Sequence, residues 1–317
     1  MTPVSSIRTR SARKAAPYPR EDHLRKLTEA LRGNLEKCAA NPEVDPVHDV
    51  RTGTRRLQAT IEAILREHSG EALQQAAAEW LAVLKKIRRA AAPVRDLDVH
   101  RELLRKSFPM DKAATADAAI SEDPVAHQVE HLDAWLHHAR QHNAAQLKKK
   151  PEKLLAGFGE RAAAFAVALQ HEPRSRRRPR SAAVVALESF AQLLNTMQYL
   201  DPGNLHDFRK GAKKARYIAE SAAEDAQALA VGKALKKLQD DIGDWHDWLV
   251  LSEEARVALG EEGKELVALL DEERERRYAV AMKTVTRLRG RLMGEWLAIS
   301  SQRRSHPRAA SRKAIVR

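Results

Sequence analysis

The sequence predicts an all-α protein built from two similar helical halves. Ala, Leu, Glu, Gln, Lys and Arg dominate residues 21–297, and apolar residues recur there at spacings of three and four, which is typical of amphipathic helices. We find no segment with a convincing strand pattern. Two blocks of distinctive residues also occur twice in the same order, which indicates an internal repeat.

The apolar periodicity predicts helices in each half, separated at polar, Gly or Pro positions. In the first half these helices are expected over residues 21–40, 46–68, 71–92, 95–107, 124–148 and 152–170. In the second half they are expected over residues 182–199, 204–223, 226–242, 245–259 and 261–297. Residues 111–123 are predicted to form a loop.

Composition excludes several classes of protein. The chain has 317 residues with a single cysteine, Cys38, so no disulfide framework can form and a reducing compartment is indicated. No uncharged apolar stretch approaches the roughly 20 residues of a membrane helix, and residues 1–20 lack the apolar core of a secretory signal. We therefore expect a soluble, cytoplasmic protein without a membrane partner.

The net charge of +13 is concentrated outside the predicted helices. Residues 1–20, 174–180 and 303–317 contain five, five and six Arg or Lys residues and no acidic residue. Such segments are typical of mobile arms and linkers. The predicted organisation is a basic arm, a first helical half, an Arg-rich linker, a second helical half and a basic tail, over residues 1–20, 21–170, 171–181, 182–297 and 298–317.

The internal repeat is the most informative feature of the sequence. The segment HDVRTGTRRL at residues 48–57 recurs as HDFRKGAKKA at residues 206–215, with His, Asp, Arg, Gly and a basic pair at the same offsets. A second block, Lys-Lys-Ile at 85–87 followed by Arg-Asp-Leu at 95–97, recurs as Lys-Lys-Leu at 236–238 and His-Asp-Trp at 246–248. Two matching blocks in one order predict two related halves.

Helical geometry separates each repeated segment into a charged face and an apolar face. On the first helix the charged face spans about 80° and holds His48, Arg51, Arg55 and Gln58, opposite Val50, Leu57, Ile61 and Ile64. On the second helix the charged face spans roughly 120° and holds His206, Arg209, Lys210, Lys213, Arg216 and Tyr217, opposite Phe208, Ala212, Ala215, Ala219 and Ala222. Gly53 and Gly211 lie at the packing side, where another helix is expected to approach closely.

The predicted starts of these helices also attract anions. Asp45 is expected to cap the first helix with Pro46 in the first helical position, and Asp201 or Asn204 to cap the second. Both histidines of the repeat would then lie in a first turn, where free N–H groups and the helix dipole favour an anion. Each histidine could instead simply bond a neighbouring helix.

The segments VHDVRTGTRRLQATI and LHDFRKGAKKARYIAE, followed by RDLDV and GDWHDWLV, resemble the signature of the CHAD family, the conserved histidine α-helical domain. The resemblance covers roughly residues 21–297. It implies two helical bundles related by a pseudo-two-fold axis, with a basic central channel that binds inorganic polyphosphate. It also implies association with polyphosphate granules. The sequence specifies no Ser-His-Asp or Cys-His arrangement and no Walker-type glycine loop, so we expect a binding role without catalysis, and no cofactor or metal.

Carried onto this sequence, the resemblance places the basic residues of the two repeats across the channel from one another. The predicted polyphosphate-binding residues are His48, Arg51, Arg55, Arg56, His206, Arg209, Lys210, Lys213, Lys214, Arg216 and Tyr217. Two positions depart from the family pattern. Gln58 stands where Arg is common, and His246 stands where Asn is common, so we assign His246 no binding role.

The residues themselves favour a bare phosphate polymer as ligand. The repeated segments 48–59 and 206–217 contain eight Arg or Lys residues and two Asp. Tyr217 is the one aromatic residue on either basic face, so little is available to stack bases. Arginine forks across phosphate oxygens and lysine supplies a mobile charge, which suits a flexible polyanion.

Two other functions stay open at this point. His206-Asp207 and His246-Asp247 could belong to a metal-dependent phosphohydrolase, although the neighbouring cations oppose metal binding. The basic tails could make weak contacts with nucleic acid, as in a general nucleic-acid binder. Arg95, Asp96, Asp98 and Asp247 are expected to cap helices or form ion pairs, and the His137-His138 and His142 cluster is interpreted as a solvated helix face.

Overall fold

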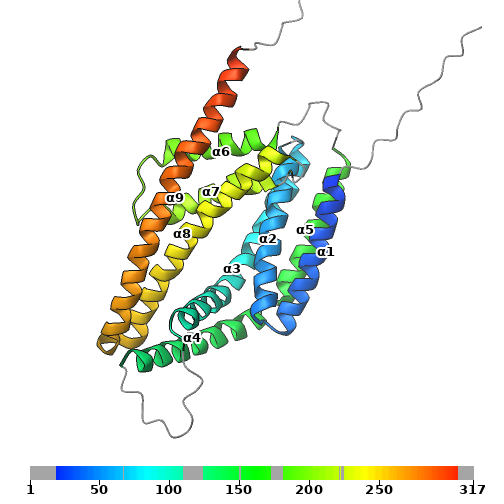
Figure 1. The fold of residues 1–317 in the computed structure, drawn as a ribbon. Helices are drawn as coiled ribbons and strands as arrows, with labels where there is room; N and C mark the ends of the chain where they lie inside the picture. Colours follow the sequence, from blue (N-terminus) through cyan, green and yellow to red (C-terminus); the bar gives the residue numbers. More distant parts are fainter. Residues whose placement is uncertain are drawn as a thin grey trace, which may run out of the picture.

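The computed structural model describes residues 19–66, 68–109, 124–149, 151–172, 181–220, 222 and 225–305, and every regular element in these ranges is helical (Figure 1). The helices are α1 (Pro19–Ala40), α2 (Val44–Leu65), α3 (Glu71–Ser107), α4 (Pro124–Lys148), α5 (Pro151–Gln170), α6 (Ala182–Thr196), α7 (Leu205–Glu220), α8 (Ala226–Leu259), the short 3₁₀ helix η1 (Gly260–Gly263) and α9 (Lys264–Ser305). The all-α prediction is confirmed. The predicted loop at 111–123 and most of the predicted arms and linker lie outside the described residues.

Two predicted helix breaks are wrong. The helix α3 runs without interruption through Pro93, and α8 runs through Gly243. Tertiary packing explains both, because Ala91 and Val94 around Pro93 are buried, as are the residues around Gly243. Burial of these neighbours compensates for the backbone hydrogen bond that proline removes and for the low helix propensity of glycine.

The end of α9 also differs from the prediction. The helix continues to Ser305, whereas the sequence predicted a helix end at 297 and a tail from 298. Trp296 and Ile299 pack against the core of the second half, which stabilises this extra helical segment. The other predicted helix ends agree with the structure within three residues.

The first half has its own apolar core, formed by α1, α2, α3 and α5. The predicted stripe of α2, which consists of Val50, Leu57, Ile61 and Ile64, is buried there. On the other side of this core, the ring of Trp80 lies against the rings of Phe158 and Phe165, with centroid distances of 6.1 and 5.3 Å. The predicted apolar face of α2 is therefore confirmed.

The second half repeats this arrangement with α6, α7, α8 and α9. Phe208, Ala212, Ala215 and Ala219 of α7 are buried in its core, as predicted. The two repeat glycines lie where neighbouring helices approach. A methyl group at Gly53 would lie 3.1 Å from Leu31 Cδ1 of α1, and one at Gly211 would lie 2.5 Å from Leu193 Cδ1 of α6.

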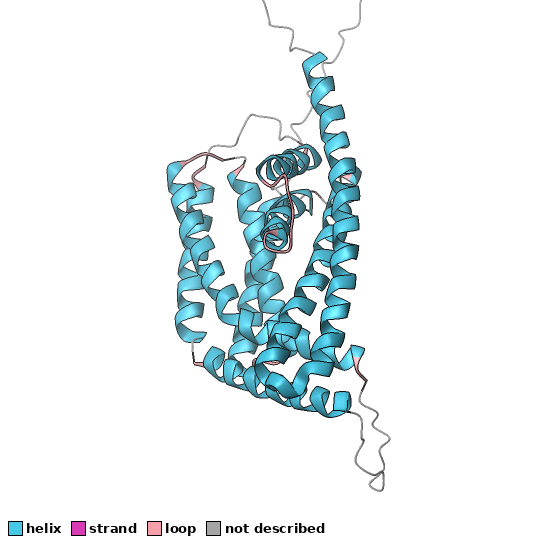
Figure 2. Cartoon of the chain, turned by 90° about the vertical axis from the view of Figure 1, so that its left-hand side faces the viewer, coloured by secondary structure: helices cyan, strands magenta, loops and turns pink. Residues whose placement is uncertain are grey.

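A third apolar cluster joins the two halves. It is formed by Leu97 and Leu104 of α3, Leu132 and Leu136 of α4, Trp248, Leu251 and Ala255 of α8, and Leu266 and Leu270 of α9. The helix α4 crosses the lower end of the molecule in Figure 1, and Figure 2 shows this end closed by crossing helices. Since α3 and α8 each run from their own core into this cluster, the cluster holds the halves in place relative to each other.

Buried polar contacts fix α4 in this position. Arg140 of α4 donates to Asp98 of α3 at 2.9 Å and to the carbonyl of Pro42, before α2, at 2.8 Å. At the other end of α4, the side chain of Gln128 accepts from the backbone N–H of Leu266 at 2.9 Å.

Within the described residues, no helix is long and apolar enough to span a membrane.

The Arg140–Asp98 ion pair provides a test of this architecture. Both side chains are buried, so Asp98→Ala removes the nearest carboxylate of a buried guanidinium and leaves only Glu43 at 3.9 Å as an ion-pair partner among the described residues. This change should lower the free energy of unfolding by about 3–5 kcal/mol. The matched control is Glu102→Ala, which removes the exposed Lys106–Glu102 pair of the same helix and should cost less than about 1 kcal/mol. Urea unfolding measures both, and equal losses would contradict the role given to Arg140.

Candidate functional site

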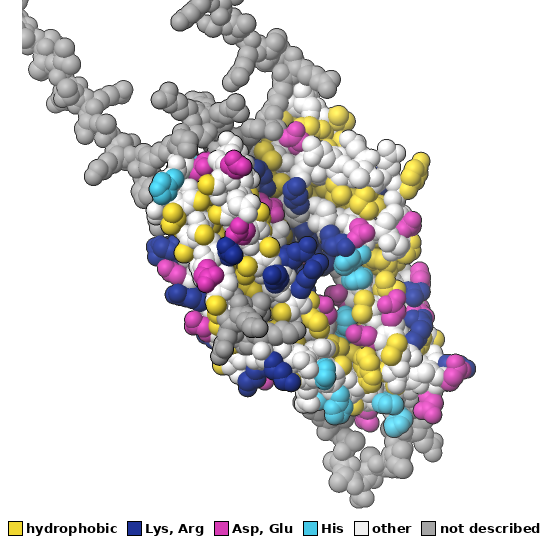
Figure 3. Space-filling model, turned by 180° about the vertical axis from the view of Figure 1, so that it is seen from behind, with side chains coloured by type: hydrophobic (Ala, Val, Ile, Leu, Met, Phe, Trp, Pro, Cys, Tyr) yellow, Lys and Arg dark blue, Asp and Glu magenta, His cyan; other side chains and the backbone are white. Residues whose placement is uncertain are grey.

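A cleft of about 1020 Å³ lies between α2 and α3 of the first half and α7 and α8 of the second. Nine Arg or Lys side chains and four carboxylates line it. The cationic residues are Arg51, Arg55, Arg88, Arg89, Arg95, Arg209, Lys210, Lys213 and Lys214. Figure 3 shows Lys and Arg side chains gathered on one face of the molecule, with histidines beside them.

The start of α2 differs from the prediction. The helix begins at Val44 after Glu43, so Asp45 lies inside the first turn and does not cap the helix. Pro46 fits there because the first four N–H groups of a helix have no intrahelical acceptor. As a result, His48 lies one turn into α2, and its predicted place in the first turn is wrong.

The predicted first-turn position of His206 is confirmed at the start of α7. Asp201 Oδ1 accepts from the backbone N–H of Asn204 at 3.0 Å, and Asn204 Oδ1 accepts from that of Asp201 at 3.1 Å. The carbonyl of Asn204 then accepts from the N–H of Phe208 at 3.0 Å. This reciprocal pair places His206 in the first turn of α7, at the positive end of the helix dipole.

The structure brings most of the predicted site residues together in the cleft. The predicted residues that line it are His48, Arg51, Arg55, His206, Arg209, Lys210, Lys213, Lys214 and Tyr217. Arg56 is exposed and does not line the cleft. The guanidinium of Arg216 lies 4.8 Å from the centre of the Tyr217 ring and within 3.4 Å of Glu220, so it also lies outside the lining.

A row of arginines on α3 was not predicted. Arg88, Arg89 and Arg95 line the cleft beside α2, and Arg88 donates to Gln58 Oε1 at 2.8 Å. Gln58, which stands where arginine is common in the family, therefore holds an arginine of the neighbouring helix α3 in the cleft. The second repeated block was the sequence signal that could have revealed these arginines, because Arg88 and Arg89 lie one turn after Lys85-Lys86.

The second repeated block occupies matching positions on the two walls of the cleft. Residues 151 positions apart in α3 and α8 both line it, namely Arg89 and Asp240, Arg95 and His246, Asp96 and Asp247, and Val99 and Val250. The two helices therefore present equivalent faces to the cleft. Their charges differ, since α3 contributes three arginines and α8 contributes two aspartates.

Lys213 is the most unusual cation of the cleft. Burial, together with the nearby positive charges of Arg209, Arg55, Arg216 and Arg51, lowers its pKa to about 6. Burial likewise lowers the pKa of Arg55 and Arg209. Because the charges that act most strongly on Lys213 are all positive, an anion in the cleft would remove a large electrostatic repulsion.

Two histidines stack at the α7–α8 side of the cleft. The ring centroids of His206 and His246 lie 4.0 Å apart, and both Nδ1 atoms are buried without a protein hydrogen-bond partner. Burial lowers the pKa of both rings, that of His246 to about 4. Both imidazoles are therefore neutral at pH 7, and His246 lines the cleft although the sequence assigned it no role.

Two of the predicted aspartate ion pairs form. Asp96 accepts from Arg51 at 2.8 Å, and Asp98 accepts from Arg140. Asp207 of the His-Asp pair forms an ion pair with Lys210. Among the residues that the structure describes, no group of three or more His, Cys, Asp or Glu side chains is arranged to hold a metal ion.

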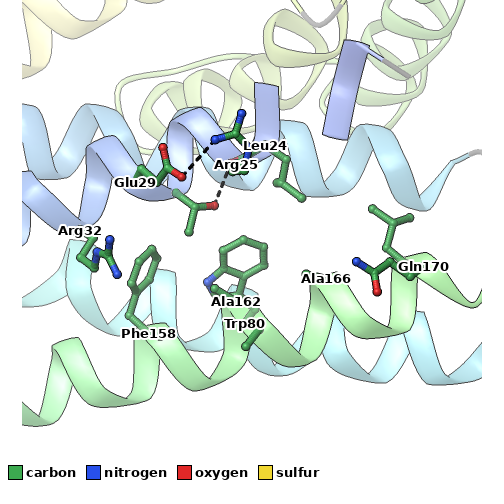
Figure 4. A pocket seen from close by; sticks show the side chains of 13 residues that line it. Leu24, Arg25, Glu29, Arg32, Trp80, Phe158, Ala162, Ala166 and Gln170 are labelled. Carbon is green, nitrogen blue, oxygen red and sulfur yellow. Dashed lines mark hydrogen bonds and ion pairs between the residues drawn. The ribbon is translucent and has the colours of Figure 1, made fainter. Parts of the chain in front are cut away.

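A second cavity, of about 500 Å³, lies between α1, α3 and α5 (Figure 4). Trp80 and Phe158 form apolar walls, and the exposed Arg25–Glu29 pair lies at the rim with a distance of 3.3 Å. This cavity lacks the concentrated charge of the cleft. The cleft is therefore the candidate site for an anionic ligand.

The sequence matches the family model described as the CHAD domain over residues 22–256. The crystal structure of the CHAD domain from the plant Ricinus communis is similar, with a TM-score of 0.56 and 20% identity over 85% of this chain and 88% of that chain. PptA from Streptomyces chartreusis is similar with a TM-score of 0.57 and 14% identity over 84% of this chain and 98% of that chain. Among curated proteins there is no significant match.

The pKa of Lys213 predicts that anion binding takes up a proton. At pH 7.5 the free amine is uncharged, since its pKa is about 6, and a phosphate beside it raises that pKa toward the usual range. Affinity for sodium triphosphate should therefore rise as pH falls from about 9 toward 6. Calorimetry in buffers of different ionisation enthalpy measures the number of protons taken up on binding. The wild-type protein should take up about one proton more than Lys213→Met, because any protons bound or released by the ligand itself are the same for both proteins. Equal proton uptake would contradict the prediction.

Proposed function

The chain belongs to the CHAD domain family, and from this premise we propose that it binds inorganic polyphosphate in the cleft between its two halves. One observation carries the proposal. Lys213 is half-buried beside arginines, with no acidic residue among the charges that act most strongly on it. A site of this kind is electrostatically incomplete until an anion with several charges enters it.

The cleft takes the place of the basic channel that the family resemblance implies, and we infer a pseudo-two-fold axis between the repeats. Supporting this inference, α2 and α7 contribute the same repeated segment, and α3 and α8 contribute matching positions. A phosphate chain has no direction along its length, so it can contact both repeats with one kind of group. Association with polyphosphate granules would follow from such binding.

The residues of the cleft favour phosphate over nucleotide bases. In the described lining, Tyr217 is the one aromatic side chain apart from the histidines, and one face of its ring is next to the Arg216 guanidinium. Proteins that bind single-stranded nucleic acid stack successive bases on several aromatic side chains. The proposed ligand is accordingly a polymer of phosphate without bases.

The proposal gives the protein a binding role without hydrolysis. A metal-dependent phosphohydrolase would need several ligands around a divalent ion, whereas His206 and His246 are surrounded by cations. Incubation with polyphosphate and Mg²⁺ or Mn²⁺ tests this point. Release of inorganic phosphate at a rate above that of Arg209→Ala would overturn the non-catalytic role.

Binding of defined-length polyphosphate should depend steeply on salt. If five to eight cations contact phosphates, log K against log salt should have a slope of roughly −3.5 to −6, at about −0.7 per contact. Arg209→Ala combined with Lys213→Ala should weaken binding and make the slope shallower by about 1 to 1.5. Unchanged affinity, with helicity and thermal stability intact, would overturn the proposed site.

The basic tails should contribute to DNA binding but little to polyphosphate binding. Residues 1–18 and 306–317 carry eight Arg or Lys residues and no acidic residue, and such charge binds nucleic acid without sequence preference. Deletion of residues 1–18 and 306–317 should therefore sharply reduce binding of duplex DNA while largely preserving polyphosphate affinity. An equal loss of both would place the polyphosphate site in the tails.

A further inference from the structure

We propose that the two repeat arginines have different roles, with Gly243 positioning Arg209 as the principal ligand-binding guanidinium while Arg51 mainly holds α3. This inference rests on the proposed function and adds a division of roles between equivalent residues. It also assigns a positioning role to Gly243, a residue inside a helix.

Arg209 lies directly against the backbone of α8. Its Nε donates to the carbonyl of Gln239 at 2.9 Å. A methyl group at Gly243 would lie 2.5 Å from Nη2 and 3.1 Å from Cζ of the same guanidinium. Only glycine at this position leaves space for the guanidinium, and the bond to Nε leaves the Nη donors for a ligand.

Arg51 is held differently, although it occupies the same place in the repeat. Its Nη1 donates both to the carbonyl of Ala92 at 3.0 Å and to Asp96 at 2.8 Å. The position equivalent to Gly243 is Ala92, and the position equivalent to Asp96 is Asp247. Within the described residues, Arg209 forms no ion pair with Asp247, so its charge is less neutralised than that of Arg51.

The charges around Arg209 are consistent with this difference. Burial lowers its pKa, while Asp247 and Asp240 of α8 act in the opposite direction from a distance. On the cleft side, Lys213 lies one turn further along α7 and is itself repelled by Arg209. An anionic group between Arg209 and Lys213 would offset the positive charge that lowers the pKa of Lys213, whereas the charge of Arg51 already has Asp96 beside it.

The presence of glycine in the middle of α8 supports a positioning role. Glycine is the least favourable residue for a helix interior after proline, and Gly243 is buried. The group that a methyl would displace is the flexible end of Arg209, not backbone. Gly243→Ala should therefore leave the fold intact while moving the guanidinium away from its position.

A double-mutant cycle tests the proposal. With polyphosphate of defined length, Arg209→Ala should weaken binding by at least about tenfold, and Gly243→Ala should cause most of that loss. Gly243→Ala added to Arg209→Ala should change nothing further, because the glycine acts through the arginine. Arg51→Ala should weaken binding less than Arg209→Ala and lower the melting temperature more.

The matched control is Gly232→Ala in the same helix. A methyl group there would lie 3.5 Å from Ala219 Cβ, an ordinary contact, and Gly232 does not line the cleft. This variant should keep its affinity and its salt dependence. Full affinity in Gly243→Ala, or an equal loss in Gly232→Ala, would overturn the positioning role.

A second measurement separates this inference from the proposed function. The ¹⁵N resonance of Arg209 Nε, assigned by its loss in Arg209→Ala, reports on the bond to Gln239 without any ligand. It should shift in Gly243→Ala and stay in place in Gly232→Ala. Failure of the wild-type protein to bind polyphosphate would overturn the proposed function, whereas an unshifted resonance in Gly243→Ala would overturn the positioning role by itself.

Discussion

Nine Arg and Lys side chains can line one cleft only if other contacts hold its walls together. The apolar cluster of α3, α4, α8 and α9 provides these contacts, and it does so at one end of the molecule. Hydrophobic burial is not directional and does not depend on charge. The repulsion within the cleft is therefore opposed by an interaction that salt and ligand leave largely unchanged, and the walls keep their separation whether or not an anion neutralises them.

The helices α3 and α8 link this cluster to the ligand site. Each helix packs in the core of its own half, lines the cleft at its middle and enters the shared cluster at its end. A break at Pro93 or Gly243 would uncouple the part of the helix in the core from the parts that line the cleft and enter the shared cluster. Because the helices are unbroken, core packing directly sets the positions of the cleft residues. A site built from long, flexible side chains can thereby be organised before a ligand binds.

The sequence predicted the features that depend on periodicity and repetition. The buried and charged faces of α2 and α7, the close approach at Gly211 and the first-turn position of His206 all follow from local patterns. The arginine row of α3 did not, because its place beside α2 depends on how two helices pack. For a related reason, the sequence did not predict the early start of α2, the unbroken helices at Pro93 and Gly243 or the longer α9. Tertiary burial overrides local propensity at these positions.

The uncharged state of Lys213 also has a chemical consequence. An amine without its proton is a nucleophile, so at neutral pH this side chain should react with acylating reagents faster than the solvated, protonated lysines of the same helix. Acylation would permanently prevent this side chain from taking up a proton when an anion binds. A bound anion, by holding the amine in its protonated form, would shield it from this modification.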